Sequence, residues 1–307
     1  MMDKILSVII PAYNEEKLIE LSYNTISKIL NDEDILYEIV YVNDGSKDNT
    51  WNNIKQLSDE HDDAKGICFS RNFGKEAAIF AGLNECSGDC CVVVDCDLQH
   101  PPQKIVEMYR LWESGYEIVE GVKSDRGTES VLHGLASRTF YGLISKATGV
   151  DMSSTSDFKL LDRKAIEVIK IIKEKHAFFR ALSFWVGFKS TQITYEVQER
   201  TEGESKWSTW GLVKYAVSNI TSFTTAPMQI VTVLGIISFI VSIVFGITAI
   251  CQKISGIALG GFTTVILLLL FMGSIIMISL GIIGYYIARI YEEIQGRPRY
   301  VVSEVIK

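Results

Sequence analysis

The stretch that decides the fold is CCVVVDCDLQH, residues 90–100, which two prolines follow directly. A run of valines is typical of a strand that is buried on both faces of a parallel sheet. Asp95 and Asp97 come at the end of this apolar run. Because residues two apart on a strand point to the same face, we expect both carboxylates to emerge together where the strand ends.

Strand and helix patterns alternate along the first 125 residues. Short apolar runs predict strands at 7–13, 37–45, 65–70, 89–97 and 116–122, and helical spacing predicts helices at 17–30, 48–61, 75–88 and 101–115. Further along, the sequence predicts an amphipathic helix at 132–147, a helix at 162–174 and a strand at 190–200. This alternation indicates an α/β fold with a mostly parallel sheet that helices cover on both faces.

Three of the predicted strands end in residues that suit ligand binding. They are Pro11, Tyr13, Asn14 and Glu15 after the first strand, Asn43, Asp44, Gly45 and Ser46 after the second, and Asp95, Asp97 and Gln99 after the fourth. Ligands of open α/β sheets bind outside the carboxyl ends of the strands, so these residues predict one site at that edge. The sequence has neither GxGxxG nor GxxxxGK[ST], so no dinucleotide fingerprint and no P-loop is indicated.

The aspartate pair has two interpretations. Two adjacent carboxylates resist ionisation together unless a cation lies between them, and Mg²⁺ or Mn²⁺ accepts such oxygen ligands. Gln99 would add a neutral oxygen. Alternatively, Asp97 or Gln99 caps the helix that starts at the two prolines, a role that is compatible with metal binding. The pair alone leaves both interpretations open, and the residues at the other strand ends favour the metal.

Composition argues against some classes of partner. The formal net charge is −7, whereas general nucleic-acid binding requires a basic face. The six cysteines form no CxxC pair, which favours buried, reduced thiols over disulfides or a metal site. Charge almost disappears from about residue 228 onward, so the chain joins two parts of different composition.

Two uncharged segments are long enough to cross a membrane. Residues 230–250 carry no charge over 21 positions and residues 262–288 carry none over 27, and a helix of about 20 residues spans a hydrocarbon core of about 30 Å. Arg289, Arg297 and Arg299 follow the second segment. The positive-inside rule therefore places the N-terminal domain and both termini in the cytosol of an inner-membrane protein with two spans. The alternative is a hairpin of two buried helices.

Four motifs resemble family 2 glycosyltransferases of the GT-A fold: IPAYNEE (10–16), VNDGSKDNT (42–50), RNFGKEAA (71–78) and DCDLQHPP (95–102). The more specific resemblance is to polyprenyl-phosphate glycosyltransferases, meaning dolichol-phosphate mannose synthases and bactoprenol (undecaprenyl-phosphate) glucosyltransferases. It continues through SDFKLLDR (156–163), FWVGF (184–188), ERTEGESKW (199–207) and the two apolar segments. The resemblance covers nearly the whole chain.

The resemblance implies roles for individual residues. The nucleotide sugar would be bound by Pro11, Tyr13, Glu15, Asp44, Lys75, Asp95, Arg200 and Lys206, and the metal by Asp95, Asp97 and Gln99. The acceptor phosphate would be bound by Lys123, Arg126 and Arg138. Asp97 and Asp157 are the implied catalytic residues, with Asp157 as a base or a positioning group. We expect Trp185 in the core, and His100 at a helix end or on the surface.

The implied reaction is an inverting transfer of a hexose to polyprenyl phosphate. The first choice is glucose from UDP-glucose and undecaprenyl phosphate, giving a β-linked lipid-phosphate sugar for cell-envelope glycosylation. UDP-N-acetylglucosamine, UDP-galactose and GDP-mannose remain open as donors, and a non-catalytic membrane-anchored nucleotide-sugar-binding protein is the alternative. The implied cofactor is Mg²⁺ or Mn²⁺, and the implied partners are membrane lipids and further copies of the chain, up to a tetramer. A processive synthase is disfavoured because no QxxRW motif occurs.

These interpretations give the expected domain organisation. We expect the nucleotide-sugar-binding half of the GT-A domain at 1–125 and an acceptor-side half, with the amphipathic helix, at 126–206. The remaining segments are an interfacial helix at 207–228, transmembrane helices at 229–251 and 262–288, and a cytosolic tail at 289–307.

Overall fold

The structure is a computed structural model that describes residues 4–124, 156–172, 174, 178–196, 226–255 and 261–307. The chain divides into two compact units. The first consists of Met1–Leu212 together with Pro298–Lys307, and the second is Val213–Arg297.

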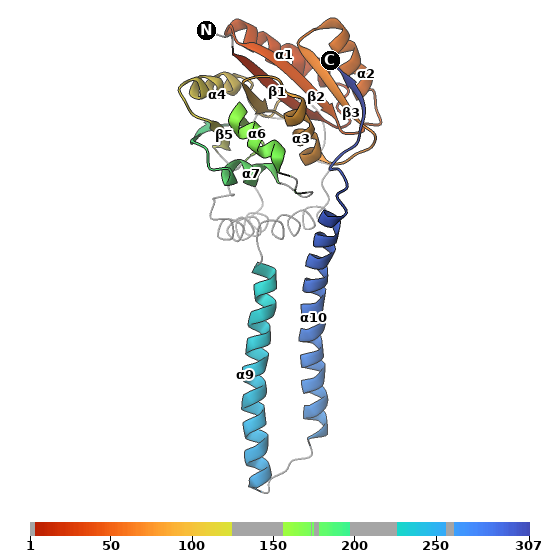
Figure 1. Ribbon diagram of the computed structural model, residues 1–307, viewed down its shortest axis with the longest axis vertical. Coiled ribbons are helices and arrows are strands. Elements are labelled where there is room, and N and C mark those ends of the chain that lie inside the picture. The colour runs from red at the N-terminus through yellow and green to blue at the C-terminus, as the bar shows by residue number, and fades with distance from the viewer. Residues whose placement is uncertain (1–3, 125–155, 173, 175–177, 197–225, 256–260) are drawn as a thin grey trace. The chain divides into compact units, whose positions relative to one another are not determined.

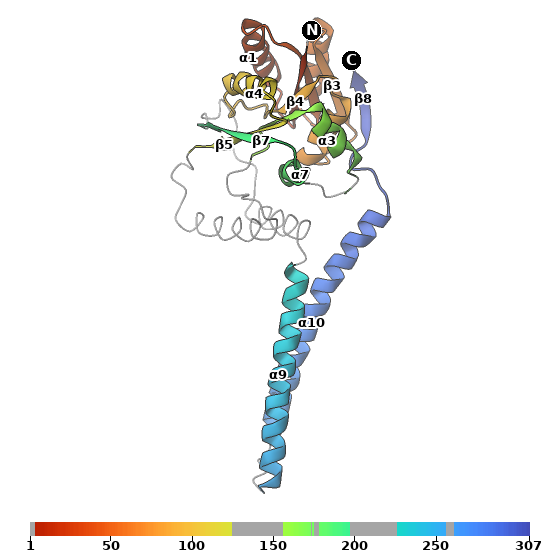
Figure 2. The ribbon, with the colours of Figure 1, turned by 60° about the vertical axis from the view of Figure 1, so that its left-hand side comes forward.

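An eight-stranded sheet forms the centre of the first unit, in the order β7-β5-β6-β4-β1-β2-β3-β8 (Figures 1 and 2). The pairs β1–β2, β1–β4, β2–β3 and β5–β7 are parallel, whereas β6 runs antiparallel to β4 and β5, and β8 runs antiparallel to β3. The predicted mostly parallel sheet is therefore confirmed. The strands are β1 (Ile5–Ala12), β2 (Leu36–Asn43), β3 (Ala64–Phe69), β4 (Cys90–Val93), β5 (Ile118–Lys123), β6 (Lys159–Asp162), β7 (Ser190–Tyr195) and β8 (Val302–Ile306).

Helices cover both faces of this sheet. One face packs against α1 (Ile19–Asp32), α2 (Thr50–Glu60) and α4 (Gln103–Glu113). The opposite face packs against α3 (Lys75–Glu85), α6 (Arg163–Ile171) and α7 (Phe179–Trp185). The apolar spacing of the sequence explains this arrangement, since in α1 the buried residues recur every three or four positions.

The strand that decides the fold is shorter than predicted. The sequence predicts a strand over 89–97, but β4 ends at Val93. Asp95 and Asp97 therefore lie on the loop that follows, and strand alternation does not aim their side chains. Leu98 in this loop has a φ of 56°, a left-handed conformation that turns the chain toward α4.

The C-terminal residues return to the sheet as its edge strand, which the sequence did not predict. β8 pairs with β3, and Trp51 Nε1 donates a hydrogen bond of 2.8 Å to Glu304 Oε2. The ring of Tyr300 stacks on Phe69 with 4.9 Å between centroids. The antiparallel β8 thus covers an edge that β3 would otherwise expose.

The second unit contains α9 (Ala226–Ile254) and α10 (Phe262–Ile294), which contact one another. Two segments of these helices, Val231–Gln252 and Phe271–Ile294, are long and apolar enough to cross a membrane, with mean hydropathies of 2.7 and 1.9. The apolar 18-residue stretches of these two segments are only 6% and 0% buried within the described structure. Apolar surfaces of this extent are unusual on a protein surrounded by water.

Candidate active site

Lys75 joins two aspartates that are far apart in the sequence. Its Nζ lies 2.6 Å from Asp95 Oδ1 and 2.9 Å from Asp157 Oδ2. Lys75 is the first residue of α3, Asp95 lies on the loop after β4, and Asp157 lies two residues before the start of β6. β6 and β4 are neighbours in the sheet, so the antiparallel pairing brings Asp157 to the edge where β4 ends.

Arg180 completes this cluster from α7. Its Nε donates to Asp157 Oδ1 at 2.6 Å, and its Nη2 donates to Asp157 Oδ2 at 2.9 Å. This is the bidentate geometry in which a guanidinium pairs most strongly with a carboxylate. Lys75, Asp95, Asp157 and Arg180 are called the charged cluster below.

The cluster holds its carboxylates as anions. Burial by itself would raise the pKa of Asp157, but the charges of Lys75 and Arg180 outweigh it and hold that pKa well below its usual range. Burial likewise opposes ionisation of Asp95, and the charge of Lys75 lowers its pKa. An anion stabilised in this way binds a proton weakly, which does not suit a general base. The geometry favours a positioning role for Asp157.

Glu76 lies beside the cluster and behaves differently. Its Oε2 accepts a hydrogen bond of 2.9 Å from the backbone N–H of Phe179. Burial, followed by the negative charge of Asp157, raises the pKa of Glu76 to about 7. Glu76 is thus a group at this site whose charge changes near neutral pH.

Hydrogen bonds between its own residues stabilise the loop that carries Asp95 and Asp97. Gln99 N donates to Asp97 Oδ1 at 3.1 Å, and Asp95 N donates to His100 Nδ1 at 3.4 Å. Of the two places expected for His100, the helix end agrees with its position three residues before α4, but the surface is wrong because its side chain is buried and stacks on Phe158 at 4.8 Å. Burial lowers the pKa of His100, and a neutral ring that accepts at Nδ1 carries its proton on Nε2.

The loops after β1 and β2 are bound to each other and to the start of α3. Asp44 accepts hydrogen bonds from the backbone N–H groups of Phe73 at 2.6 Å and Gly74 at 2.9 Å. Asn14 N donates to Ser46 Oγ at 2.9 Å, and Lys47 N donates to Asn14 Oδ1 at 2.9 Å. The predicted meeting of strand ends at one edge is therefore present in the structure.

Comparison with known proteins identifies the family of the chain. A family model described as glycosyl transferase family 2 matches residues 7–171. This chain belongs to glycosyl transferase family 2. The predicted family and the prediction of a glycosyltransferase are thereby confirmed.

Relatives within glycosyl transferase family 2 match nearly the whole chain. The prophage bactoprenol glucosyl transferase homolog of Escherichia coli (strain K12) is 35% identical over 98% of this chain and 99% of its own length. The bactoprenol glucosyl transferase of Shigella phage SfX is 35% identical, over 97% and 98%. An uncharacterized glycosyltransferase of Synechocystis sp. is 36% identical, over 98% and 95%.

Among solved structures, the chain is similar to glucosyl-3-phosphoglycerate synthase from Mycobacterium tuberculosis, in a complex with Mn²⁺, UDP-glucose and phosphoglyceric acid. The two share 19% sequence identity with a TM-score of 0.49, and the match covers 71% of this chain and 79% of the synthase.

The structure describes some of the residues for which the sequence predicts roles and not others. It brings Lys75, Asp95 and Asp157 into direct contact. It places Lys123 at the end of β5, where burial and the positive charge of Arg180 lower the pKa of the lysine. Four predicted residues and the predicted amphipathic helix lie outside the described residues: Arg126, Arg138, Arg200, Lys206 and 132–147.

Sequence reasoning missed Arg180 and Glu76 as members of this family 2 site. Arg180 interrupts the apolar run HAFFRALSFW, residues 176–185. A single cation in such a run is rarely buried without an anionic partner. That signal would have identified Arg180 as a residue with a partner elsewhere, but it does not say which carboxylate the partner is.

Proposed function

We propose that this chain transfers glucose from UDP-glucose to undecaprenyl phosphate (bactoprenol), with inversion at the anomeric carbon. The observation that carries the proposal is the charged cluster, in which two cations and two anions meet where the sheet ends. The names of two full-length relatives, both bactoprenol glucosyl transferases, support the donor sugar and the lipid acceptor. The exposed apolar helices α9 and α10 suit a chain whose acceptor is dissolved in a membrane.

The proposed reaction is a single displacement. A phosphate oxygen of the acceptor forms a bond to the anomeric carbon while the bond from that carbon to the UDP oxygen breaks. UDP leaves with the electron pair, and an α-linked donor gives a β-linked product. A phosphate monoester is already an anion near neutral pH, so the reaction does not require a strong base. Orientation and neutralisation of the leaving charge supply most of the rate.

The charged cluster suits those two tasks. The ammonium group of Lys75 lies beside Asp95. Asp95 is on the loop after β4, where we propose that the diphosphate binds. Asp157 fixes the positions of Lys75 and Arg180 through the contacts described above. We propose that Pro11, Tyr13, Glu15 and Asp44 bind the nucleoside, that Arg200 and Lys206 close over the diphosphate, and that Lys123, Arg126 and Arg138 bind the acceptor phosphate.

The residues after β4 fit a hard divalent cation. Asp95, Asp97 and Gln99 offer oxygen donors, as Mg²⁺ and Mn²⁺ prefer. Within the described residues, no group of three or more His, Cys, Asp and Glu side chains is arranged to hold an ion. A nucleotide-sugar metal also takes oxygens from the substrate phosphates, so it needs only one or two protein carboxylates. When bound, Mg²⁺ or Mn²⁺ would neutralise diphosphate charge.

We propose a membrane location with the catalytic unit and both termini in the cytosol. Arg289, Arg297 and Arg299 follow the uncharged run 262–288, with Arg289 in the last part of α10 and the other two beyond it. Cytoplasmic flanks of membrane-spanning helices carry an excess of such residues. The chain would act as a homo-oligomer, with residues 207–228 at the membrane interface. In chains from which the exposed Cys251 has been removed, Gln252→Cys and Lys307→Cys test this orientation. A membrane-impermeant thiol reagent added to intact cells should label the cysteine at 252 and not the one at 307.

Sugar transfer by the purified full-length chain tests the proposed function. The chain, in detergent, is incubated with radiolabelled UDP-glucose, undecaprenyl phosphate and Mn²⁺, and the organic-phase label is counted. We expect label in the lipid fraction, and less label with UDP-N-acetylglucosamine, UDP-galactose or GDP-mannose. Nucleotide-sugar binding without any lipid label would instead support the non-catalytic alternative.

Two variants distinguish loss of the proposed metal site from the general effect of losing one carboxylate in this assay. Asp97→Asn should lower turnover at least about 100-fold at saturating Mn²⁺ and donor, and EDTA should abolish turnover by the unmodified chain. Glu107→Gln, on the exposed face of α4, is the matched loss of one carboxylate and should leave turnover within about twofold. Full turnover by Asp97→Asn would exclude the proposed metal site.

A further inference from the structure

A buried ion pair lies next to the charged cluster. Lys159 Nζ is 2.9 Å from Glu120 Oε1, and the two side chains are only 1% and 2% exposed. Taking two charges out of water is costly, and well-packed apolar residues of similar volume often stabilise a core as well or better. Stability alone therefore does not explain why β5 and β6 carry this pair.

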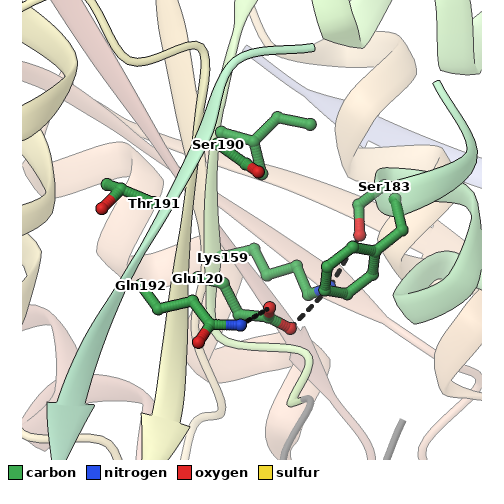
Figure 3. A pocket seen from close by; sticks show the side chains of 8 residues that line it. Glu120, Lys159, Ser183, Ser190, Thr191 and Gln192 are labelled. Atoms are coloured by element: carbon green, nitrogen blue, oxygen red, sulfur yellow. Dashed lines mark hydrogen bonds and ion pairs between the residues drawn. The ribbon is translucent and has the colours of Figure 1, made fainter. Parts of the chain in front are cut away.

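Apart from the ion pair with Glu120, the contacts of the Lys159 ammonium group lie on one face of α7. Its Nζ donates to the backbone carbonyl of Arg180 at 3.1 Å and to Ser183 Oγ at 2.7 Å, and it lies 4.4 Å from the ring centroid of Phe184. These positions are i, i+3 and i+4 of one helix face. Figure 3 shows the Lys159 side chain extending between Glu120 and Ser183.

Glu120 keeps the lysine in place. Its second oxygen, Oε2, accepts a hydrogen bond of 3.2 Å from Gln192 Nε2 on β7. The cavity beside the pair has a volume of about 20 Å³, which is room for about one water molecule. This cavity is too small to bind a substrate. The role of the buried Lys159–Glu120 pair must therefore lie in its contacts within the protein.

The helix that Lys159 contacts has little stability of its own. α7 has seven residues, and its N-cap, Phe178, offers no side-chain hydrogen bond. Helices this short are unstable in isolation. The first backbone N–H of α7, that of Phe179, is instead bound by Glu76 of α3. Glu76 and Lys159 therefore hold the first turn of α7 through the N–H of Phe179 and the carbonyl of Arg180.

Arg180 is the residue at which these contacts converge. Lys159 binds its backbone, and its guanidinium pairs with Asp157, only two residues before Lys159 in the chain. We propose that Lys159, balanced by Glu120, is a positioning residue that sets the place and rotation of α7 so that Arg180 meets Asp157. Displacements of about 1 Å in such supporting residues reduce turnover strongly.

A double-mutant cycle tests this role in the sugar-transfer assay. Lys159→Met alone leaves the Glu120 carboxylate buried without its cation, which is strongly destabilising, so Lys159→Met is combined with Glu120→Gln. We expect this pair of changes to lower kcat about 30- to 100-fold, with KM changed less than about threefold. In an Arg180→Ala background, the same pair should lower kcat by less than about threefold further. Multiplicative losses in the combined variant would overturn the proposal.

The matched control removes an ion pair that faces water. Lys164 of α6 lies 3.5 Å from Glu117, and its side chain is 74% exposed. Lys164→Met with Glu117→Gln makes the same chemical change and should alter kcat by less than about twofold.

A second measurement does not depend on the proposed function, on which the kinetic test rests. Hydrogen–deuterium exchange of the backbone amides of α7 should be at least about tenfold faster in Lys159→Met with Glu120→Gln. Exchange in α4 should be unchanged. If the unmodified chain transfers no sugar, the proposed function fails but this measurement still tests the placement of α7. Unchanged protection of α7 would overturn the positioning role whatever the activity.

Discussion

Arg180 and Asp157 form a two-point ion pair, with Nε and Nη2 donating to the two carboxylate oxygens at 2.6 and 2.9 Å. The Nζ of Lys75 lies 2.9 Å from one of the same oxygens. Asp157 is therefore surrounded by cations and only 4% exposed. Its carboxylate is better suited to hold Lys75 and Arg180 in place than to remove a proton.

The pH dependence of an Asp157→Asn variant distinguishes the two roles. We expect kcat to fall about 100-fold, because asparagine cannot pair with both cations. The acidic limb of the pH–rate profile should keep its shape, since we assign it to protonation of the acceptor phosphate and not to Asp157. If Asp157 were the base, the variant would lose this limb. Rates of both proteins between pH 5 and 9 provide the comparison.

Glu76→Gln should make stability less dependent on pH. The folded-state pKa of Glu76, about 7, is above its ordinary value of 4.5. The stabilisation from its protonated form is therefore present below pH 4.5 and is lost as the pH rises through 7. Glutamine keeps an oxygen that accepts from Phe179 N but does not ionise. At pH 8 the variant should gain on the order of 1–3 kcal/mol.

Thermal midpoints of the two proteins at pH 5 and pH 8 check this prediction. The variant should gain several degrees relative to the unmodified chain at pH 8 and much less at pH 5. An equal shift at both pH values would mean that ionisation of Glu76 does not cause the difference.

The parallel part of the fold could be predicted because its signals are local. Apolar runs and helical spacing identify β1 to β4 and the helices between them, and the carboxyl ends of parallel strands meet by topology. This is why the sequence predicts Asp44 and Asp95 at one edge, whereas Lys75 is expected there only from the resemblance to glycosyltransferases. The prediction that Asp95 and Asp97 lie on the strand itself is wrong. The valine run shows that the segment is buried, but it does not show at which residue the hydrogen bonds to the neighbouring strands end.

The antiparallel strands β6 and β8 and the short helix α7 are only weakly indicated by the sequence. β6 has four residues, and its first, Lys159, is a buried lysine that breaks the apolar pattern. β8 pairs with β3, more than 200 positions earlier in the chain, so no local sequence pattern predicts this pairing. α7 is too short for periodicity, and the expectation of Trp185 in the core is wrong because its side chain is 72% exposed.

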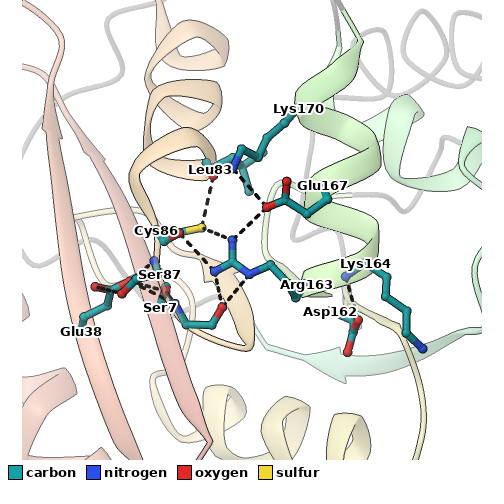
Figure 4. A network of polar contacts seen from close by, with 11 residues as sticks. Ser7, Glu38, Leu83, Cys86, Ser87, Asp162, Arg163, Lys164, Glu167 and Lys170 are labelled. Atoms are coloured by element: carbon teal, nitrogen blue, oxygen red, sulfur yellow. Dashed lines mark hydrogen bonds and ion pairs between the residues drawn. The ribbon is translucent and has the colours of Figure 1, made fainter.

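Glu38→Gln should remove stability that the chain has only above acidic pH. Figure 4 shows Glu38 beside Ser7 and Ser87, and hydrogen bonds of 2.6 and 2.7 Å join the carboxylate to their hydroxyls. Burial alone would raise the pKa of Glu38, but Lys65, Ser7 and Ser87 together lower it to about 2. This stabilisation is present above pH 4.5 and is lost as the pH falls toward 2. At pH 7 the variant should lose on the order of 2–3 kcal/mol.

Thermal unfolding at pH 7 and pH 3 measures the difference, with Glu107→Gln as the control. Glu107 pairs with Lys104 on the exposed face of α4, where such pairs contribute about 0.5 kcal/mol. The Glu38→Gln deficit should shrink at pH 3. A deficit that does not change with pH would point to lost packing and not to the lost charge.

Gly45→Ala should disrupt the site by moving Asp44. Gly45 has a φ of 64°, and a Cβ there would lie 2.3 Å from the backbone carbonyl carbon of Arg71. The backbone cannot move aside easily, because Asp44 binds the N–H groups of Phe73 and Gly74. We expect a loss of more than about 2 kcal/mol in stability. Because Asp44 would shift, KM for UDP-glucose should rise by about tenfold or more.

Gly187→Ala separates the clash from the backbone strain. Gly187 has a similar φ of 70°, but a Cβ there would meet nothing within 4 Å. This variant should lose only about 1 kcal/mol, the ordinary strain of a left-handed alanine, and KM should be unchanged. Urea unfolding and donor titrations of both variants make the comparison. Equal losses in the two proteins would show that strain dominates, and that the close approach of the loops at Gly45 does not hold Asp44 in place.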